Sequence, residues 1–245
     1  MTTKRLFLVR HAESENNVDK REAKRSLKEL FIAPKREDWQ RIGRLVTVPM
    51  NSALSPDGEH MVDIQRAALE RDDFVARHQI ELIVHSHLLR AKLTAHGLFG
   101  NLASGHVGSK TTVTPFIEHP LLFEKNVKET LLDKTPLLGG LLKTTLHVAS
   151  IEDRIKEVKA WLLARPETTV LVVGHSAFFR NMLGPALVDG ATPHPDNCDV
   201  WYTQLHEDGS CCETRLLVPG GRSLLSNPSE PSDPSRAPSA SVLDM

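Results

Sequence analysis

The chain has 245 residues, of which 25% are charged, and its formal net charge at pH 7 is −1. This length suits one large α/β domain or two small ones. The near-zero net charge argues against a general attraction to nucleic acid or to an anionic membrane surface, so we expect neither as a partner.

Targeting signals and cysteine usage predict a cytoplasmic protein. No apolar run approaches the roughly 20 residues of a membrane-spanning helix. Charged residues interrupt the amino-terminal segment, so it lacks the long apolar core of a signal peptide. The three cysteines show no Cys-x-x-Cys spacing, which favours reduced thiols in a cytosolic compartment.

Two short apolar runs each lead to a histidine. Arg5–Val9 is typical of a buried strand and is followed by Arg10 and His11. Residues 169–173 form a second such run, and His175 follows it after one glycine. Because open α/β sheets bind ligands at the carboxyl ends of their strands, we expect the two histidines to meet at one edge of the sheet.

The segment 19–50 carries an excess of basic residues. Leu27, Leu30 and Phe31 recur at helical spacing and predict an amphipathic helix that ends near Pro34. A solvent-exposed helical face is the simpler interpretation of these charges. A basic flap that attracts an anionic substrate is the alternative.

The middle of the chain predicts a helix, a strand and a second helix. Ser55 with Pro56 is a typical helix start, and the helix is expected to run to about His78. Residues 80–84 then predict a buried strand, and Arg90 is expected in the first turn of the helix after it. Residues 107–112 predict a loop, and residues 112–114 a short strand.

The carboxyl-terminal part predicts a helix from Ser150 to about Arg165 and a further helix after His175. Residues 200–205 and 214–218 predict the two strands of an antiparallel hairpin. From Pro219 the sequence becomes rich in serine and proline, so residues 219–245 are expected to be a disordered tail.

Three of these segments resemble the signatures of the histidine phosphatase (phosphoglycerate mutase-like) superfamily. The matching segments are Arg10-His11-Ala12-Glu13-Ser14 with Asn17, Ser86 to Ala95 around Arg90, and Gly174-His175. The resemblance covers roughly residues 4–205. It implies an α/β fold, a three-layer α/β/α sandwich with a mostly parallel central sheet. The expected domain spans residues 1–218, with residues 19–50 as an insertion.

The resemblance also implies a role for each matching residue. His11 would be the nucleophile, and Arg10, Arg90 and His175 would bind and stabilise the phosphoryl group. Glu124 would transfer the proton of the leaving group, with Glu118 as the rival carboxylate. Ser14 and Asn17 can donate further hydrogen bonds to phosphate. Because side chains supply the positive charge, we expect no metal and no other cofactor.

The expected function is that of a phosphatase acting on a small phosphorylated substrate. Two alternatives remain open, namely a phosphoglycerate mutase-type transfer and a non-catalytic protein that binds phosphorylated ligands. Mutases of the superfamily usually have tryptophan at the position of Asn16, and Gly-Asn-Ser at residues 176–178, which favours hydrolysis here. Ala12 replaces the usual glycine of the first signature. The sequence leaves the substrate's identity and the oligomeric state open.

Overall fold

A computed structural model describes residues 3–30, 51–107, 110–124, 150–184 and 194–225. The helix end expected near Pro34 and most of the predicted tail lie outside these residues.

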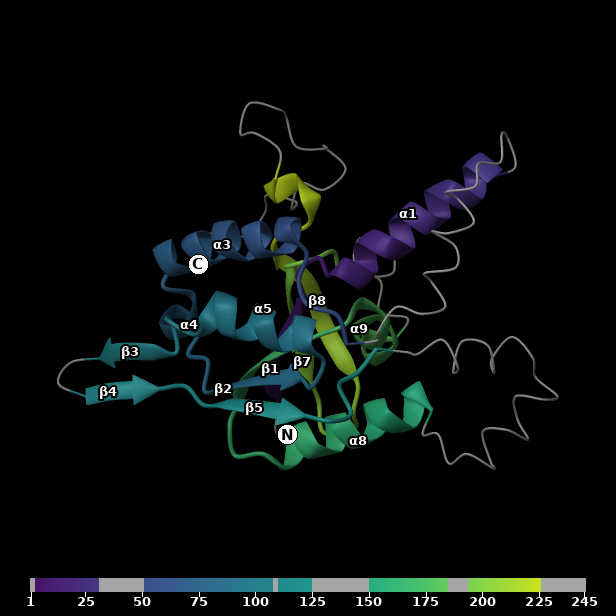
Figure 1. Ribbon diagram of the computed structural model, residues 1–245. Coiled ribbons are helices and arrows are strands. Elements are labelled where there is room, and N and C mark those ends of the chain that lie inside the picture. Colours follow the sequence, from purple (N-terminus) through teal and green to yellow (C-terminus); the bar gives the residue numbers. More distant parts are fainter. Residues whose placement is uncertain (1–2, 31–50, 108–109, 125–149, 185–193, 226–245) are drawn as a thin grey trace.

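A six-stranded sheet forms the centre of the protein, with the strand order β5-β2-β6-β1-β7-β8 (Figure 1). Neighbouring strands from β5 to β1 run parallel, whereas β7 is antiparallel to β1 and β8 is antiparallel to β7. The strands are β1 (Lys4–Arg10), β2 (Leu82–Ser86), β5 (Phe116–His119), β6 (Thr169–Gly174), β7 (Val200–Leu205) and β8 (Cys211–Val218). The mostly parallel sheet predicted from the sequence is confirmed.

Helices cover both faces of the sheet, as expected for three layers (Figure 1). One face packs against α3 (Pro56–Arg71), α4 (Phe74–Arg77) and α5 (Leu89–Phe99), and the other against α8 (Ile151–Ala164) and α9 (Ser176–Leu183). Alternate residues of β1 point to opposite faces of the sheet. Phe7 and Val9 belong to the hydrophobic core on the α3 side, and Leu6 and Leu8 belong to the core on the α8 side. Such near-continuous apolar runs are typical of parallel strands buried on both faces. The three-layer sandwich is therefore confirmed.

The helix that starts at Ser55 is shorter than predicted. Its start is as expected, since Ser55 Oγ accepts a hydrogen bond from the Gly58 amide at 3.1 Å. It ends at Arg71, because Asp73 adopts the left-handed conformation with φ of 46°. The short helix α4 then completes the segment that was expected to be one helix.

The second strand is shifted relative to its prediction. The Ile80 amide donates to the Val75 carbonyl at 2.9 Å, so Ile80 closes the turn after α4. The strand β2 begins at Leu82 instead and continues to Ser86.

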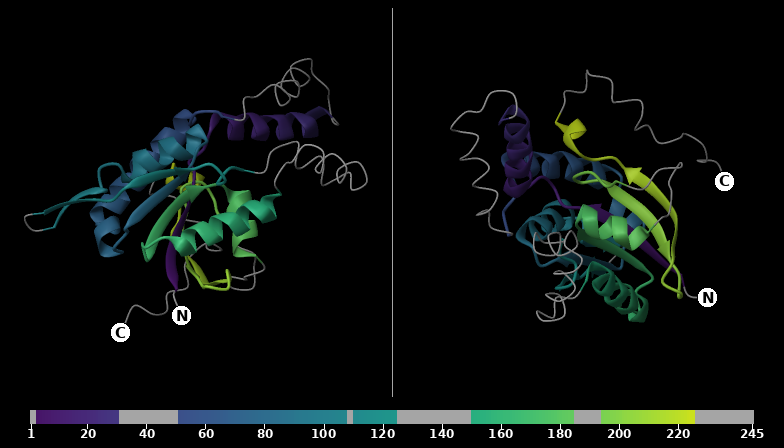
Figure 2. Two further views of the ribbon diagram at one scale, coloured as in Figure 1. Left: turned by 90° about the horizontal axis from the view of Figure 1, so that it is seen from below. Right: turned by 90° about the vertical axis from the view of Figure 1, so that its right-hand side faces the viewer.

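The segment 104–119 contains more strand than predicted. The expected loop at residues 107–112 belongs to a hairpin of β3 (Ser104–Val107) and β4 (Lys110–Val113), which extends beyond the central sheet (Figure 2). The edge strand β5 follows it and was not predicted. In contrast, the helix after Ser150 and the hairpin of β7 and β8 are confirmed, with β8 starting earlier, at Cys211.

The predicted start of the tail at residue 219 is too early. Arg222–Leu224 form the 3₁₀ helix η1, and Leu224 and Leu225 pack against the core on the α3 side of the sheet. Disorder of residues 226–245 stays a prediction. At the amino-terminal end, helix α1 (Glu15–Leu30) starts before the expected insertion and extends away from the sheet (Figure 1). No helix in the described ranges is long and apolar enough to cross a membrane.

Candidate active site

Parallel pairing of β1 with β6 brings His11 and His175 together. Arg10 pairs with Gly174 in the register, and the His11 amide donates to the Gly174 carbonyl at 3.0 Å. The two imidazole rings lie with their centroids 5.0 Å apart. Both side chains are buried. The structure thus shows the two histidines together at the carboxyl edge of the sheet, as the sequence predicts.

Arg90, in the first turn of α5, lies between the two histidines and Glu124. Its Nε donates to His11 Nε2 at 3.2 Å, and its Nη2 donates to Glu124 Oε2 at 2.9 Å. The same Nη2 lies 3.5 Å from His175 Nδ1, a weaker contact. A buried guanidinium therefore links both imidazoles to a carboxylate.

These contacts fix which nitrogen of each imidazole carries a proton. A guanidinium only donates hydrogen bonds, so His11 Nε2 and His175 Nδ1 must offer lone pairs to Arg90. His11 Nδ1 donates to the Ala12 carbonyl at 2.6 Å, and His175 Nε2 donates to Ser86 Oγ at 3.0 Å. His11 thus presents a lone pair on Nε2, the nitrogen that points toward Arg90.

Both histidines are held in their neutral form. Burial lowers the pKa of His11 well below its ordinary value, and the positive charges of Arg90 and Arg10 lower it further. Burial also lowers the pKa of His175, followed by the effects of His11 and Arg90. A neutral imidazole has the free electron pair that a nucleophile needs.

The two candidate carboxylates differ clearly in position. Glu124 lies 2.9 Å from Arg90 Nη2, whereas Glu118 forms an exposed ion pair with Lys92 at 3.6 Å. The structure therefore brings Glu124 to the histidine pair and leaves Glu118 on the surface.

The remaining predicted residues surround the pair less closely. Arg10 Nη1 donates to the Pro195 carbonyl at 3.0 Å and lies 3.7 Å from the Asp196 carboxylate. Among the described residues, the buried Nε of Arg10 has no hydrogen-bond partner. Ser14 Oγ donates to Asn17 Oδ1 at 2.9 Å, so these two side chains contact each other. Phosphate binding by Arg10, Ser14 and Asn17 stays a prediction.

Several solved structures with a similar fold are named as phosphatases. No family model and no curated protein matches the sequence. The chain is similar to alpha-ribazole phosphatase from Shigella flexneri, with a TM-score of 0.50, 14% identity, and coverage of 87% of this chain and 95% of that chain.

The chain has the histidine phosphatase fold. The chain is also similar, with a lower TM-score, to YhfR from Bacillus stearothermophilus (TM-score 0.48, 18% identity, 92% of this chain and 100% of that one). A mycobacterial glucosyl-3-phosphoglycerate phosphatase in complex with VO3 is similar to the same degree (TM-score 0.48, 17% identity, 89% of this chain and 99% of that one).

The histidine phosphatase fold of this chain accommodates Ala12 without strain. A positive backbone φ favours glycine, and Ala12 is not among the described non-glycine residues that have a positive φ. The Ala12 side chain is buried in the core, and its amide donates a hydrogen bond to Thr94 Oγ1 at 3.0 Å.

Residues that sequence reasoning missed support the loop that carries His11. Asn197 Nδ2 donates to the His11 carbonyl at 2.7 Å, and Thr94 Oγ1 both accepts from Ala12 and donates to the Arg90 carbonyl at 2.7 Å. Thr94 belongs to the segment that resembles the superfamily signature, so that resemblance was a usable signal. Asn197 carries no such signal, because it reaches the loop from a distant part of the chain.

Arg154 supports the segment that carries Glu124 and was also missed. Its buried guanidinium donates to the Phe123 carbonyl at 2.7 Å and lies 3.7 Å above the Phe123 ring. A charged side chain is seldom fully buried unless it is well bonded. Arg154 therefore fixes the backbone immediately before Glu124.

The centre of the site also has the chemistry of a metal site. One ligand atom from each of His11, Glu124 and His175 lies within 4.8 Å of the others, a group that could hold a metal ion. The sequence analysis placed these three residues in one catalytic site and expected no metal there. Arg90 donates to atoms of the same three residues, so a cation of the protein already lies among them.

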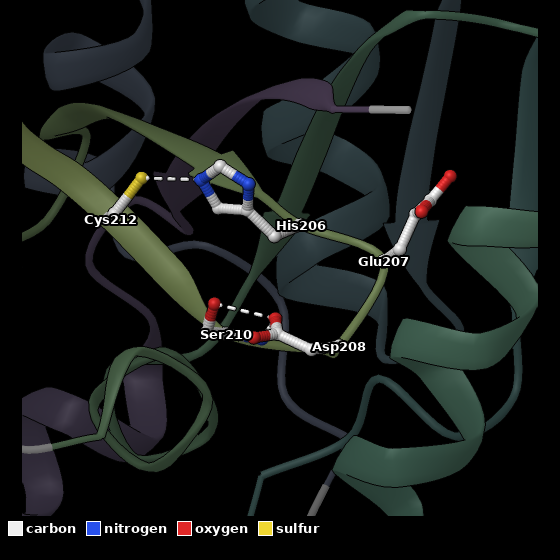
Figure 3. A pocket seen from close by; sticks show the side chains of 5 residues that line it. All are labelled: His206, Glu207, Asp208, Ser210 and Cys212. Carbon is white, nitrogen blue, oxygen red and sulfur yellow. Dashed lines mark hydrogen bonds between the residues drawn. The ribbon is translucent and has the colours of Figure 1, made fainter. Parts of the chain in front are cut away.

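A cavity of about 370 Å³ lies away from the histidines, at the turn between β7 and β8 (Figure 3). It is lined by His206, Glu207, Asp208, Ser210 and Cys212. Leu205 pairs with Lys4 at the start of β1, so this turn is at the edge of the sheet opposite His11. The chemistry of the histidine cluster, and not the cavity, marks the candidate active site.

Proposed function

We propose that this protein is a metal-independent phosphatase that hydrolyses a small phosphomonoester through a phosphohistidine on His11. One observation carries the proposal: a neutral imidazole with its Nε2 lone pair directed at a buried guanidinium, and a carboxylate bonded to that same guanidinium. Phosphoryl transfer needs this combination of a nucleophile, positive charge and a proton donor.

In the first step, His11 Nε2 attacks phosphorus as the bond from phosphorus to the ester oxygen breaks. Arg90 turns its donors from His11 to the phosphoryl oxygens, which carry the charge of the transition state. Glu124, in its protonated form, gives its proton to the leaving oxygen, so an alcohol departs and a phosphohistidine remains.

In the second step, water attacks phosphorus and the bond to His11 Nε2 breaks. Glu124, now a carboxylate, takes a proton from the water, and inorganic phosphate leaves. The His11 Nδ1 proton stays on Nδ1 and hydrogen-bonded to the Ala12 carbonyl throughout, which keeps Nε2 as the reacting nitrogen. His175 adds a hydrogen bond to the phosphoryl group in its other neutral tautomer, with its proton on Nδ1 and Ser86 Oγ donating to Nε2.

The independence of metal rests on the position of Arg90. Its guanidinium already donates to His11 and Glu124, two of the three residues that could hold a metal ion, so the protein's own cation supplies the positive charge there. The cytoplasmic location expected from the sequence stays a prediction.

A panel of phosphomonoesters tests the proposal, with release of inorganic phosphate as the readout. We expect wild type to release phosphate and His11→Ala to release none, while the matched control His60→Ala, at an exposed histidine, keeps the wild-type rate. Acid-labile, base-stable radioactive phosphate trapped on wild type during turnover would identify the phosphohistidine.

The same panel separates the two alternatives. A mutase would trap phosphate on His11 but pass it to a second phosphoglycerate faster than to water. A non-catalytic binding protein would release and trap nothing with any ester, and wild type and His11→Ala would be equally inert.

A further inference from the structure

Glu13 is a buried carboxylate in the loop that carries His11. Its side chain is only 4% exposed. Arg222 Nη2 donates to both of its oxygens at 3.0 Å, and Arg222 Nε donates to Oε2 at 3.2 Å. Arg21 also bonds to Glu13, and Ser55 Oγ donates to Oε1 at 3.2 Å.

These bonds compensate the burial of the charge. Burial raises the pKa of Glu13, but the hydrogen bonds from Arg21 and Arg222 outweigh it, and the pKa lies below its ordinary value. The carboxylate therefore remains charged at neutral pH. A buried charge is tolerated only while its partners are in place, so loss of either arginine would drive Glu13 toward water.

The segment that carries Arg222 also holds the loop on the other side of His11. The Gly220 amide donates to Asp199 Oδ1 at 2.6 Å, and the Gly221 amide donates to the Asn197 carbonyl. A Cβ atom at residue 220 would lie 2.3 Å from the Asn197 carbonyl oxygen, so this close approach requires glycine. Asn197 in turn donates to the His11 carbonyl.

The carboxyl-terminal segment 220–222 thus contacts the nucleophile loop along two routes. One passes through Glu13, two residues after His11, and the other passes through Asn197 to the His11 carbonyl itself. Arg222 also pairs with Asp57 in the first turn of α3 at 3.0 Å, which fixes the segment to the helix layer.

We propose that Arg222 is a positioning residue for His11, which holds the loop 11–14 through the carboxylate of Glu13. The inference rests on the proposed phosphatase function for its effect on rate. In-line attack requires the nucleophile to be held within about 0.5 Å of the productive geometry, so a loosened loop lowers the rate of chemistry more than it weakens substrate binding.

Steady-state kinetics give the first test. We expect Arg222→Ala to lower kcat at least about tenfold with KM changed less than about threefold, because the phosphate-binding cation Arg90 is untouched. Arg222→Lys should retain part of the rate. The matched control Arg215→Ala removes an exposed arginine that stacks on Tyr202 and should keep the wild-type kcat.

Chemical rescue distinguishes positioning from a general loss of structure. The Arg222 side chain is 51% exposed, so a small guanidinium ion in solution has access to Glu13 once the side chain is removed. Added methylguanidinium should raise kcat of Arg222→Ala severalfold and leave Arg215→Ala and wild type unchanged. If methylguanidinium fails to raise kcat of Arg222→Ala at every concentration that wild type tolerates, the positioning role is overturned.

Amide hydrogen exchange tests the loop without any need for activity. Exchange at residues 11–14 should be faster in Arg222→Ala than in wild type and unchanged in Arg215→Ala. Unchanged exchange in Arg222→Ala, or a kcat within twofold of wild type, would overturn the proposal. If Arg222→Ala does not fold, Arg222→Lys and Glu13→Gln serve in the same two measurements with the same criteria.

The two proposals fail in different ways. If wild type releases no phosphate from any ester, the proposed function fails, while the exchange experiment still decides whether Arg222 holds the loop. If wild type is active and Arg222→Ala matches it, the positioning role fails alone.

Discussion

Arg90 Nε donates a hydrogen bond to His11 Nε2 across 3.2 Å, to the same lone pair that would attack phosphorus. The cation that would bind the substrate therefore also covers the nucleophile. Under the proposed function, a phosphate group would offer the guanidinium stronger acceptors, draw it from His11 and free the lone pair. Substrate binding and exposure of the nucleophile would then be coupled through this one side chain.

Replacement of Arg90 should lower the rate sharply. We expect Arg90→Ala to lose at least about tenfold in kcat/KM, equivalent to roughly 1.4 kcal/mol of transition-state stabilisation. Arg90→Lys should recover little, because a lysine cannot span His11 and Glu124 with separate donors. Arg66→Ala, which removes a surface ion pair with Asp63, is the control and should change the rate by less than twofold. A smaller loss in Arg90→Ala would mean that Arg90 does not bind the phosphoryl group.

Substrates with different leaving groups distinguish the role of Glu124 from that of Glu118. If Glu124 protonates the leaving oxygen, Glu124→Gln should slow an alkyl phosphate at least about 100-fold, a typical size for general acid catalysis. It should slow p-nitrophenyl phosphate far less, because nitrophenolate leaves without a proton. Glu118→Gln, at the exposed pair with Lys92, should affect neither substrate. Equal losses on both substrates in Glu124→Gln would argue for a binding role instead.

Arg154 should act on the rate through Glu124. Arg154→Met keeps an unbranched apolar stem but loses the donor to the Phe123 carbonyl, so we expect a stability loss of about 1–3 kcal/mol. Its rate loss should show the same leaving-group dependence as Glu124→Gln and should largely disappear in the Glu124→Gln background. Arg165→Met, at an arginine that lies over Trp161, controls for the loss of a stacked cation. Additive losses in the double variant would show that Arg154 does not work through Glu124.

The neutral histidines predict a direction for the dependence on pH. Burial, Arg90 and Arg10 lower the pKa of His11, so NMR titration should find it neutral at a pH where a histidine of the unfolded chain is protonated. The unfolded chain has an ordinary histidine pKa of about 6.5 and takes up protons that the folded chain does not. The free energy of unfolding should therefore fall as the pH drops below about 6.5, by up to about 1.4 kcal/mol per pH unit for each such histidine.

One variant separates the contribution of His175 to this pH dependence from the contributions of the other histidines. His175→Gln removes one of the two buried imidazoles, whose pKa is lowered chiefly by burial, and should reduce the slope of unfolding free energy against pH between about 6.5 and 5.5. An unchanged slope would show that His175 takes up its proton as readily in the folded chain as in the unfolded one.

The basic residues of α1 allow a test of the flap interpretation. Arg21 is bonded to Glu13, so it is not available to steer a substrate. Lys20→Gln with Lys24→Gln should raise KM for a multiply phosphorylated ester more than for a singly phosphorylated one, and added salt should remove the difference. Equal KM changes for the two esters would leave α1 as an ordinary solvent-exposed helix.

Local patterns in the sequence predicted the sheet and the centre of the site. The apolar runs of β1 and β6 predicted two buried strands, and the rule for strand ends placed His11 and His175 together. The place of Arg90 followed from the predicted strand and helix around it, and its role from the resemblance of this segment to the superfamily signature. Each of these inferences uses residues that are neighbours along the chain.

The residues that were missed act across long separations. Arg222 bonds to Glu13 over 209 positions, and Asn197 bonds to His11 over 186 positions, so no local period signals either contact. The early end of α3 depends on the left-handed backbone of Asp73. Aspartate adopts this conformation only occasionally, so its presence alone does not predict the end of a helix. The polar strand β3 lacks the apolar alternation on which strand prediction depends.

The position of β1 between β6 and β7 sets an order for biogenesis. The strand made first must wait for partners that are translated more than 150 residues later, since β6 begins at Thr169 and β7 at Val200. Until then its apolar residues have no sheet to join, and chaperones that bind exposed strands are expected to hold the nascent chain. A chain that ends before Val200 would contain both histidines, but β1 would have no partner on one of its two sides.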